Sequence, residues 1–355
     1  MTPDQRLFWV KRLTLIFLGI GMALSFPLWL NERELTLVPP FDVIPVLSPP
    51  WDMVLLGLIG VLMMANFIFV LHKFSSALLP ILLLLLMFQD YTRFQPWYWQ
   101  YVWLLIIIIP YAGYYKIYRE RDHLYQALLI GFVACYLWAG VFKINEVFVP
   151  NLVPYLVSPI TNYLVTYKHI IHPMGHLLPY SEILLALGLL FHKTRKPSVI
   201  LGVGFHLGIA VLFSPWGLNT NLIIIPWNVF LAIALPLLFW GYSKPLSFKM
   251  LPKLPSVSKL GLAIFFVLPA LNFFGVYNKS LAFELYSGNN FVSDLEWKRS
   301  EIKQIPPSFE PYVYAYGDMV YLKTYVWGTE LCKVPPNPDP RALMRMQECV
   351  LKEFQ

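Results

Sequence analysis

Long hydrophobic runs separated by short polar segments make up the first three quarters of the chain. A membrane-spanning helix needs about twenty consecutive apolar residues, or fewer where flanking residues reach the interface. Nine runs fit this length, and we predict transmembrane helices over 13–30, 53–71, 76–89, 97–115, 124–142, 178–191, 197–213, 222–242 and 260–276. The first is interpreted as a retained helix, because it is long for a signal peptide and no small-residue cleavage site follows it.

The pattern changes after residue 276. Residues 312–316 and 320–326 alternate in polarity around Gly317-Asp318, which predicts a β-hairpin. A helix is expected over 340–354, with Asp339 as its N-cap. We therefore divide the chain into a transmembrane domain (1–276) and a small α+β C-terminal domain (277–355) that packs on the outer, membrane-facing surface.

The positions of the cysteines allow one disulfide to be considered. Cys332 and Cys349 are the only cysteines of the C-terminal domain, and a compartment outside the cytoplasm permits oxidation. They are candidates for a disulfide. Cys135 falls within the fifth predicted span and is interpreted as a packing residue.

Composition agrees with a protein that is mostly dissolved in lipid. Hydrophobic residues make up 57% of the chain and charged residues only 13%, where a soluble protein has about a quarter charged. The mean hydropathy is +0.58. Twelve Trp and 21 Tyr suit a chain anchored at two interfaces. The expected fold class is an all-α polytopic membrane protein with a small extracytoplasmic α+β domain.

The distribution of basic residues predicts the orientation. With the N-terminus in the cytoplasm, 14 basic residues fall in cytoplasmic segments, whereas the external loops between helices hold only Arg33, Arg93 and Lys168. Nine spans then place residues 277–355 outside. The net charge of +7 follows from this topology, so nucleic acid is not an expected partner. The basic loops favour a bacterial inner membrane.

Ionisable residues within the predicted spans are candidates for function, because a charged side chain in lipid is costly. Lys143, Glu182 and His206 fall at similar depth near the outer leaflet, on three consecutive helices that we expect to be neighbours. Structural explanations remain open: Lys143 could reach the interface, His206 could join two helices, and Glu182 could be hydrated or pair with Lys143. Asp90 is interpreted as an interfacial residue.

The external loop over 144–177 is long and strongly apolar. It carries His169, His172 and His176 at a spacing that suits one face of a metal-binding helix. However, Pro173 and Gly175 interrupt such a helix, and no carboxylate or cysteine joins the run. We predict no metal site and expect instead a re-entrant or interface-lying segment that covers the three candidate residues.

The segments around these residues resemble a known family. The stretch 136–143, ending in Trp138-Ala139-Gly140-Val141-Phe142-Lys143, the later Glu182, and Gly204-Phe205-His206-Leu207 resemble the HTTM superfamily, the membrane domain shared with vitamin K-dependent gamma-carboxylase. The resemblance covers about 124–242. A weaker resemblance, to DoxX and MauE-type membrane proteins tied to quinone or thiol redox chemistry, rests on 138–143 and on Pro179-x-x-Glu182.

The resemblance implies roles for particular residues. Lys143 matches the lysine thought to deprotonate vitamin K hydroquinone, and His206 matches the histidine of a Phe-His motif. Glu182 is the third catalytic candidate because of its predicted depth, although a carboxylate beside Lys143 would favour the ammonium and oppose a role as base. Trp138 and His176 are candidates for contacting a quinone or quinol cofactor. The chain lacks the large lumenal region of the carboxylase, so glutamate carboxylation itself does not follow.

Two classes of function therefore remain open. The first is an enzyme or enzyme subunit that uses a lipophilic quinol-type cofactor to modify an extracytoplasmic polypeptide or lipid. The second is a non-enzymatic accessory or scaffold subunit of a bacterial envelope complex, with the C-terminal domain as its docking module. A transporter is less favoured, because no inverted repeat is visible.

Overall fold

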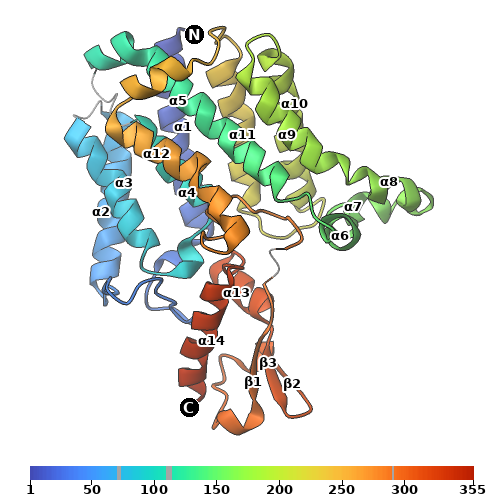
Figure 1. The fold of residues 1–355 in the computed structure, drawn as a ribbon. Coiled ribbons are helices and arrows are strands. Elements are labelled where there is room, and N and C mark those ends of the chain that lie inside the picture. Colours follow the sequence, from blue (N-terminus) through green and yellow to red (C-terminus); the bar gives the residue numbers. More distant parts are fainter. Residues whose placement is uncertain (70–72, 109–113, 290–291) are drawn as a thin grey trace.

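The computed structural model describes residues 1–69, 73–108, 114–289 and 292–355. Over these ranges the chain is mostly helical, with a small sheet near the C-terminus (Figure 1). The predicted end of the second span at residue 71 and residues 109–113 of the fourth lie outside the described residues. The same holds for the side chains of three basic residues used in the charge count, Lys73, Lys116 and Arg119.

Each predicted hydrophobic segment contains a helix of one bundle. In the described part of the chain these helices are α1 (Pro3–Leu24), α2 (Trp51–Ile68), α3 (Lys73–Met87), α4 (Pro96–Ile108), α5 (Tyr114–Val141), α9 (Leu177–Leu190), α10 (Arg195–Phe213), α11 (Ile224–Phe239) and α12 (Ser256–Phe266). Five helical segments are long and apolar enough to cross a membrane by length and composition, or six if the bent pair 165–174 and 177–190 counts as one span. The integral-membrane character is thus supported, at a coarser level than the predicted count of nine.

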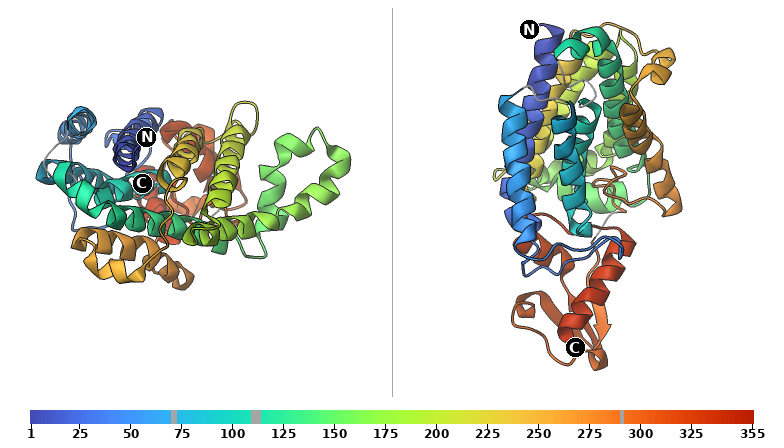
Figure 2. Two further views of the ribbon diagram at one scale, coloured as in Figure 1. Left: turned by 90° about the horizontal axis from the view of Figure 1, so that it is seen from above. Right: turned by 90° about the vertical axis from the view of Figure 1, so that its left-hand side faces the viewer.

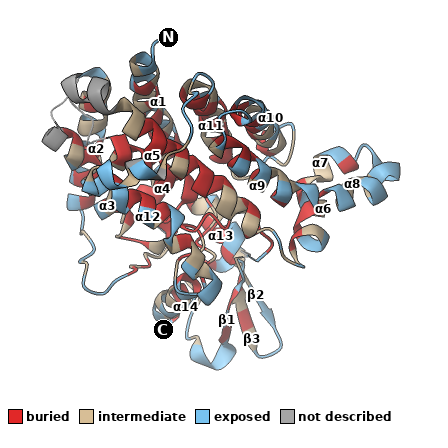
Figure 3. Ribbon diagram, turned by 45° about the horizontal axis from the view of Figure 1, so that its top comes forward, coloured by how far each residue is buried: buried red, intermediate tan, exposed pale blue. Residues whose placement is uncertain are grey.

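Helices α4 and α5 lie at the centre of the bundle. The described side chains of α4 are almost all buried, and 78% of the spanning part of α5 is buried inside the molecule (Figure 3). The outer helices instead expose large apolar side chains such as Val61, Leu184 and Val211. Apolar surface directed outward from a helical bundle is the pattern expected where lipid is the solvent.

The observed ends of the first helix differ from the predicted ones. α1 begins at Pro3, ten residues before the predicted start, because Thr2 and Gln5 form a capping box and Pro3 occupies the first helical position. It ends at Leu24, and the 3₁₀ helix η1 (Phe26–Trp29), which contains Pro27, follows. Polar residues of the first turns thus extend the helix beyond its apolar run.

The segment between α5 and α9 forms a lateral arm of short helices. It comprises the π-helical turn η4 (Phe148–Leu152), α6 (Val153–Leu156), α7 (Ser158–Thr161), the 3₁₀ turn η5 (Val165–Tyr167) and α8 (Lys168–Met174). The arm projects sideways from the bundle near the end that carries the C-terminal domain (Figures 1 and 2). Its exposed apolar side chains, among them Ile160, Val165 and Ile170, suit a segment lying at a membrane interface.

The C-terminal domain contains the predicted hairpin and helix. Strands β2 (Val313–Tyr316) and β3 (Met319–Leu322) pair antiparallel around Gly317, whose φ of +58° favours glycine. Helix α14 spans Pro340–Phe354, and the Asp339 side chain accepts a hydrogen bond from the Arg341 amide. Sequence reasoning missed two elements, β1 (Leu295–Lys298), which completes a sheet of order β1-β3-β2, and α13 (Thr324–Cys332).

The predicted disulfide is wrong for this structure, because Cys332 and Cys349 are both free thiols. Cys332 ends α13 and is buried where that helix meets the bundle, and burial raises the pKa of its thiol to about 11. Cys349 lies beside the buried face of α14 and is partly exposed. The two thiols therefore face different surroundings.

The C-terminal domain is attached to one end of the bundle, and the N-terminus lies at the opposite end (Figure 2). Polar contacts hold the attachment: the Gln95 side chain donates to the Pro335 carbonyl at 3.2 Å, and the Asn337 side chain to the Tyr91 carbonyl at 3.1 Å. Asp90, expected at an interface, is fully buried here in an ion pair with Arg33. The C-terminal domain therefore packs on one end of the bundle.

Candidate functional site

A cavity of about 250 Å³ lies among α5, α9, α10 and α11, and we call it the inner cavity. Most of its wall is apolar, and the first half of the lateral arm closes part of it with Phe148, Leu156 and Ile160. Its polar lining residues include Gln100, Cys135, Tyr136, Lys143, Glu182, His206 and Asn228. All three predicted catalytic candidates therefore line one cavity.

Lys143 and Glu182 form an ion pair at one end of the inner cavity. The Lys143 ammonium donates to both carboxylate oxygens of Glu182, at 2.8 and 3.1 Å, and to the Ala139 carbonyl at 3.0 Å. The side chains are only 10% and 7% exposed. An ammonium has three N–H donors, so each donor of Lys143 has an acceptor.

Gly140 makes this ion pair possible by allowing α5 and α9 to approach closely. A Cβ atom at this position would lie 2.7 Å from the Pro179 carbonyl oxygen and 3.2 Å from the Glu182 Cβ. Any side chain at residue 140 would therefore push α9, and with it Glu182, away from α5. Gly140 therefore sets the distance between α5 and α9 at the ion pair.

A second polar group, centred on His206, occupies another part of the same wall. The Tyr136 hydroxyl lies 2.6 Å from His206 Nε2, and His206 Nδ1 lies 2.7 Å from Asn228 Oδ1. The Asn228 amide nitrogen donates to the Ile224 carbonyl, which leaves Oδ1 as the acceptor. His206 Nδ1 therefore carries the proton in the neutral ring, and Nε2 accepts from the Tyr136 hydroxyl.

Helix α5 positions both polar groups. Tyr136 lies on α5, and Lys143 lies in the turn two residues beyond its last residue, Val141. Seven residues of helical backbone correspond to about 10 Å along the axis and nearly the same face. Glu182 comes from α9, His206 from α10 and Asn228 from α11. The inner cavity thus presents two hydrogen-bonding groups separated by an apolar stretch, between helices that bury no other ion pair in the described part of the chain.

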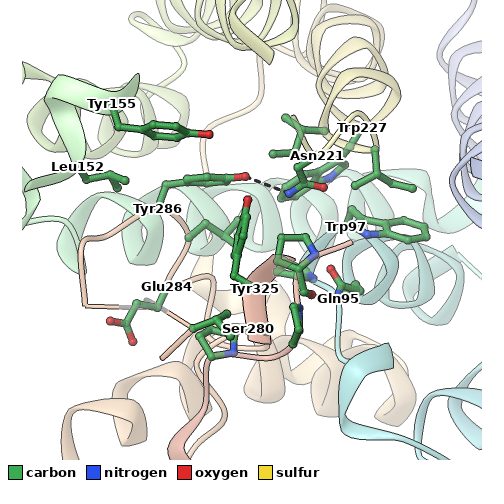
Figure 4. A pocket seen from close by; sticks show the side chains of 18 of the residues that line it. Gln95, Trp97, Leu152, Tyr155, Asn221, Trp227, Ser280, Glu284, Tyr286 and Tyr325 are labelled. Carbon is green, nitrogen blue, oxygen red and sulfur yellow. Dashed lines mark hydrogen bonds between the residues drawn. The ribbon is translucent and has the colours of Figure 1, made fainter. Parts of the chain in front are cut away.

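A larger cavity of about 420 Å³ lies between the bundle and the C-terminal domain, and we call it the outer cavity (Figure 4). It is lined from α4 by Trp97, from the lateral arm by Tyr155, from α13 by Tyr325, and from the proline-rich segment that precedes α14. Ile224, Trp227, Leu285 and Tyr286 line both cavities. The two cavities are therefore neighbours.

Two predicted cofactor contacts lie away from the inner cavity. The Trp138 indole donates to the Phe266 carbonyl at 3.0 Å and stacks on Phe142. His176 is exposed at the start of α9, and neither residue lines the cavity. Among the described residues, no cluster of three or more His, Cys, Asp and Glu side chains could hold a metal ion, and the histidine run of α8 is no exception.

Sequence reasoning missed Tyr136 and Asn228. Both are uncharged, whereas the free-energy cost of placing a side chain in lipid singles out ionisable residues. A signal was available for Tyr136, because its spacing of seven residues from Lys143 predicts a shared helix face. The signal for Asn228 was weaker: it is a single polar residue within the apolar run of α11.

Comparison with known proteins adds no assignment: no protein-family model, curated protein or solved structure matches this chain.

Proposed function

We propose that this chain is an integral protein of a bacterial inner membrane with nine transmembrane helices, a cytoplasmic N-terminus and an extracytoplasmic C-terminal domain. The supports are the excess of basic residues in alternate loops and the position of the two termini at opposite ends of the bundle. In this orientation both cavities lie toward the outer side of the membrane.

We propose further that the inner cavity binds a lipophilic quinol-type ring, and that the protein is an enzyme or enzyme subunit acting on an extracytoplasmic substrate. The observation that carries this is the pair of polar groups separated by an apolar stretch. A flat ring with an oxygen at each end can hydrogen-bond with both groups while its faces contact apolar side chains, as pockets for small ligands generally require.

His206 is the proton acceptor in this proposal. Nε2 of His206 would accept the Tyr136 proton, and the Tyr136 oxygen would in turn accept a proton from a hydroxyl of the bound ring, so Tyr136 would stay neutral. Lys143, the base in the HTTM-like hypothesis, donates to the Ala139 carbonyl and to both oxygens of Glu182, which leaves none of its donors for a bound ring. We therefore assign Lys143 to holding Glu182, whose carboxylate accepts from the second quinol hydroxyl.

Binding of ubiquinol and menaquinol analogues to the protein in lipid nanodiscs tests this proposal. Tyr136→Phe removes one hydroxyl from the cavity and is expected to weaken binding about tenfold. Trp138→Phe is the matched control, since Trp138 lies on the same helix but outside the cavity. Absence of quinol binding to the native protein, or equal losses in both variants, would contradict the proposal.

One observation favours the alternative function, an accessory subunit of an envelope complex. Strand β2 is an edge of the sheet, and its tyrosines Tyr314 and Tyr316 are exposed, which suits docking of a partner. This alternative predicts that deletion of residues 278–355 abolishes function in cells whereas Tyr136→Phe is tolerated. The reverse result would favour the enzyme.

A further inference from the structure

The outer cavity contains polar atoms without a hydrogen-bond partner. Trp97 is 3% exposed, yet its indole Nε1 donates to no acceptor, and the side-chain oxygen of Asn221 accepts from no donor. The Asn221 amide nitrogen is used, because it donates to the Tyr286 hydroxyl at 3.0 Å. Both atoms lie beneath the cavity wall and expose almost no surface to it, so a ligand would mainly meet the ring faces and hydroxyls of the lining residues.

Aromatic rings and neutral polar groups form the walls of this cavity. Figure 4 shows the hydroxyls of Tyr155, Tyr286 and Tyr325 pointing to the space beside Asn221. Trp97 and Trp227 supply indole rings from α4 and α11. Burial raises the pKa of the Tyr155 and Tyr286 phenols, which therefore remain protonated and neutral.

The interior of the outer cavity is uncharged. Its lining includes one carboxylate, that of Glu284, which accepts from the Asn272 amide and points away from the three tyrosines in Figure 4. Neither lysine, arginine nor histidine occurs among its described lining residues. An anionic ligand would thus find no counter-charge, and a neutral ligand suits this environment better.

The proline-rich wall argues against a peptide ligand. Pro335, Pro336 and Pro338 have no N–H group, and the Pro335 carbonyl is already used by Gln95. A peptide main chain bound here would lack the backbone donors that extended peptides normally use. Recognition must therefore come from side chains.

We infer that the outer cavity binds an uncharged glycosyl group. A sugar ring has apolar C–H faces that pack on aromatic rings, and each of its hydroxyls both donates and accepts, which matches the hydroxyls of Tyr155, Tyr286 and Tyr325. A volume of about 420 Å³ accommodates a group of this size. The sugar could belong to a free saccharide or to the headgroup of a glycolipid, and both present the same chemistry.

The outer cavity adjoins the inner cavity, and this position relates its ligand to the proposed reaction. Trp227 and Tyr286 separate it from the inner cavity, so a bound sugar would lie beside the bound quinol. The role of the sugar as the extracytoplasmic substrate rests on the proposed function, whereas its binding to the outer cavity does not depend on that function.

The experiment measures saccharide binding to the protein in nanodiscs prepared without glycosidic detergent. Maltose is titrated and followed by saturation-transfer NMR, and nanodiscs containing monoglucosyl diacylglycerol are analysed by native mass spectrometry. Binding of either probe is expected, and the probe that binds identifies the source of the sugar. Binding of neither probe to the native protein overturns the inference.

Two matched variants test the location of the site. Tyr325→Phe removes a hydroxyl that points into the outer cavity and is expected to weaken binding about tenfold. Tyr314→Phe is the control: it lies in the same domain, is similarly exposed (40% against 37% for Tyr325), and does not line the outer cavity. Equal binding by both variants overturns the inference.

Quinol binding is measured on the same samples. Tyr325→Phe is expected to retain it, because Tyr325 does not line the inner cavity, and this also reports that the variant is folded. If the native protein binds sugar but no quinol, the proposed function fails and the glycosyl site stands. If it binds quinol but no sugar, the reverse conclusion holds.

Discussion

The Lys143–Glu182 ion pair joins two helices inside the bundle, where each charge depends on the other for solvation. Removing one partner of a buried pair leaves an uncompensated charge, and Lys143→Met is expected to lower the free energy of unfolding by about 3–5 kcal/mol. The double variant Lys143→Met/Glu182→Leu is expected to recover much of this loss. Thermal or denaturant unfolding in detergent, followed by circular dichroism, measures both.

The exposed ion pair between Lys244 and Asp122 provides the comparison for this prediction. Their side chains are 62% and 32% exposed, so Lys244→Met is expected to cost less than about 1 kcal/mol. A loss for Lys143→Met no larger than that for Lys244→Met would show that water reaches the inner pair.

At the residue scale, side-chain charge predicted which residues line the inner cavity, whereas closeness to Lys143 in the sequence did not. Lys143, Glu182 and His206 were found because ionisable groups are rare in lipid-embedded helices. Trp138 was chosen from its place in the same motif, but five residues along a helix turn it about 140° away from Lys143. Tyr136, two full turns before Lys143, lies on the correct face, and only helix geometry indicates it.

The close packing of α5 on α9 depends on Gly140, and this gives a prediction at the scale of the element. Gly140→Ala places a methyl group within 3 Å of the Pro179 backbone, which cannot move without shifting α9. We expect a loss of about 1–3 kcal/mol in the free energy of unfolding, together with weaker quinol binding as Glu182 is displaced.

Gly204→Ala on α10 is the matched control for this substitution. A Cβ atom there meets no neighbour within 4 Å, and alanine is the better helix former by about 1 kcal/mol. Its stability is therefore expected to be equal to or above that of the native protein. Similar losses for both variants would mean that glycine is required for some reason other than helix spacing.

Apolar runs located the helices of the bundle but not all of their ends, because polar caps and tertiary contacts decide where an element starts and stops. The predicted second strand of the hairpin extends to residue 326, yet β3 ends at Leu322. Thr324 ends it by donating to the Leu322 carbonyl and accepting from the Leu295 amide of β1. This contact joins residues 29 positions apart and leaves no local pattern.

For the whole molecule, hydropathy and charge supply different information. Length and composition single out five spans among the described residues, and the shorter α11 and the described part of α4 do not meet that criterion. Thirteen residues of helix cover only about 20 Å. Because α4 is surrounded by protein, its polar ends need not reach across a full lipid thickness. The basic-residue count therefore carries the topology, and it can be tested directly.

Two introduced cysteines report the topology of the chain. Lys193, between α9 and α10, follows six predicted spans, whereas Tyr316, in the C-terminal domain and 79% exposed, follows nine. In a variant whose three native cysteines are replaced by alanine, a membrane-impermeant maleimide applied to spheroplasts is expected to label Tyr316→Cys but not Lys193→Cys. Lysis should expose both to the reagent. Because each span reverses the side of the chain, an error of one helix between these positions would place both on the same side. Labelling of both or neither before lysis would then exclude the nine-helix arrangement, and a reversed pattern would place both cavities toward the cytoplasm.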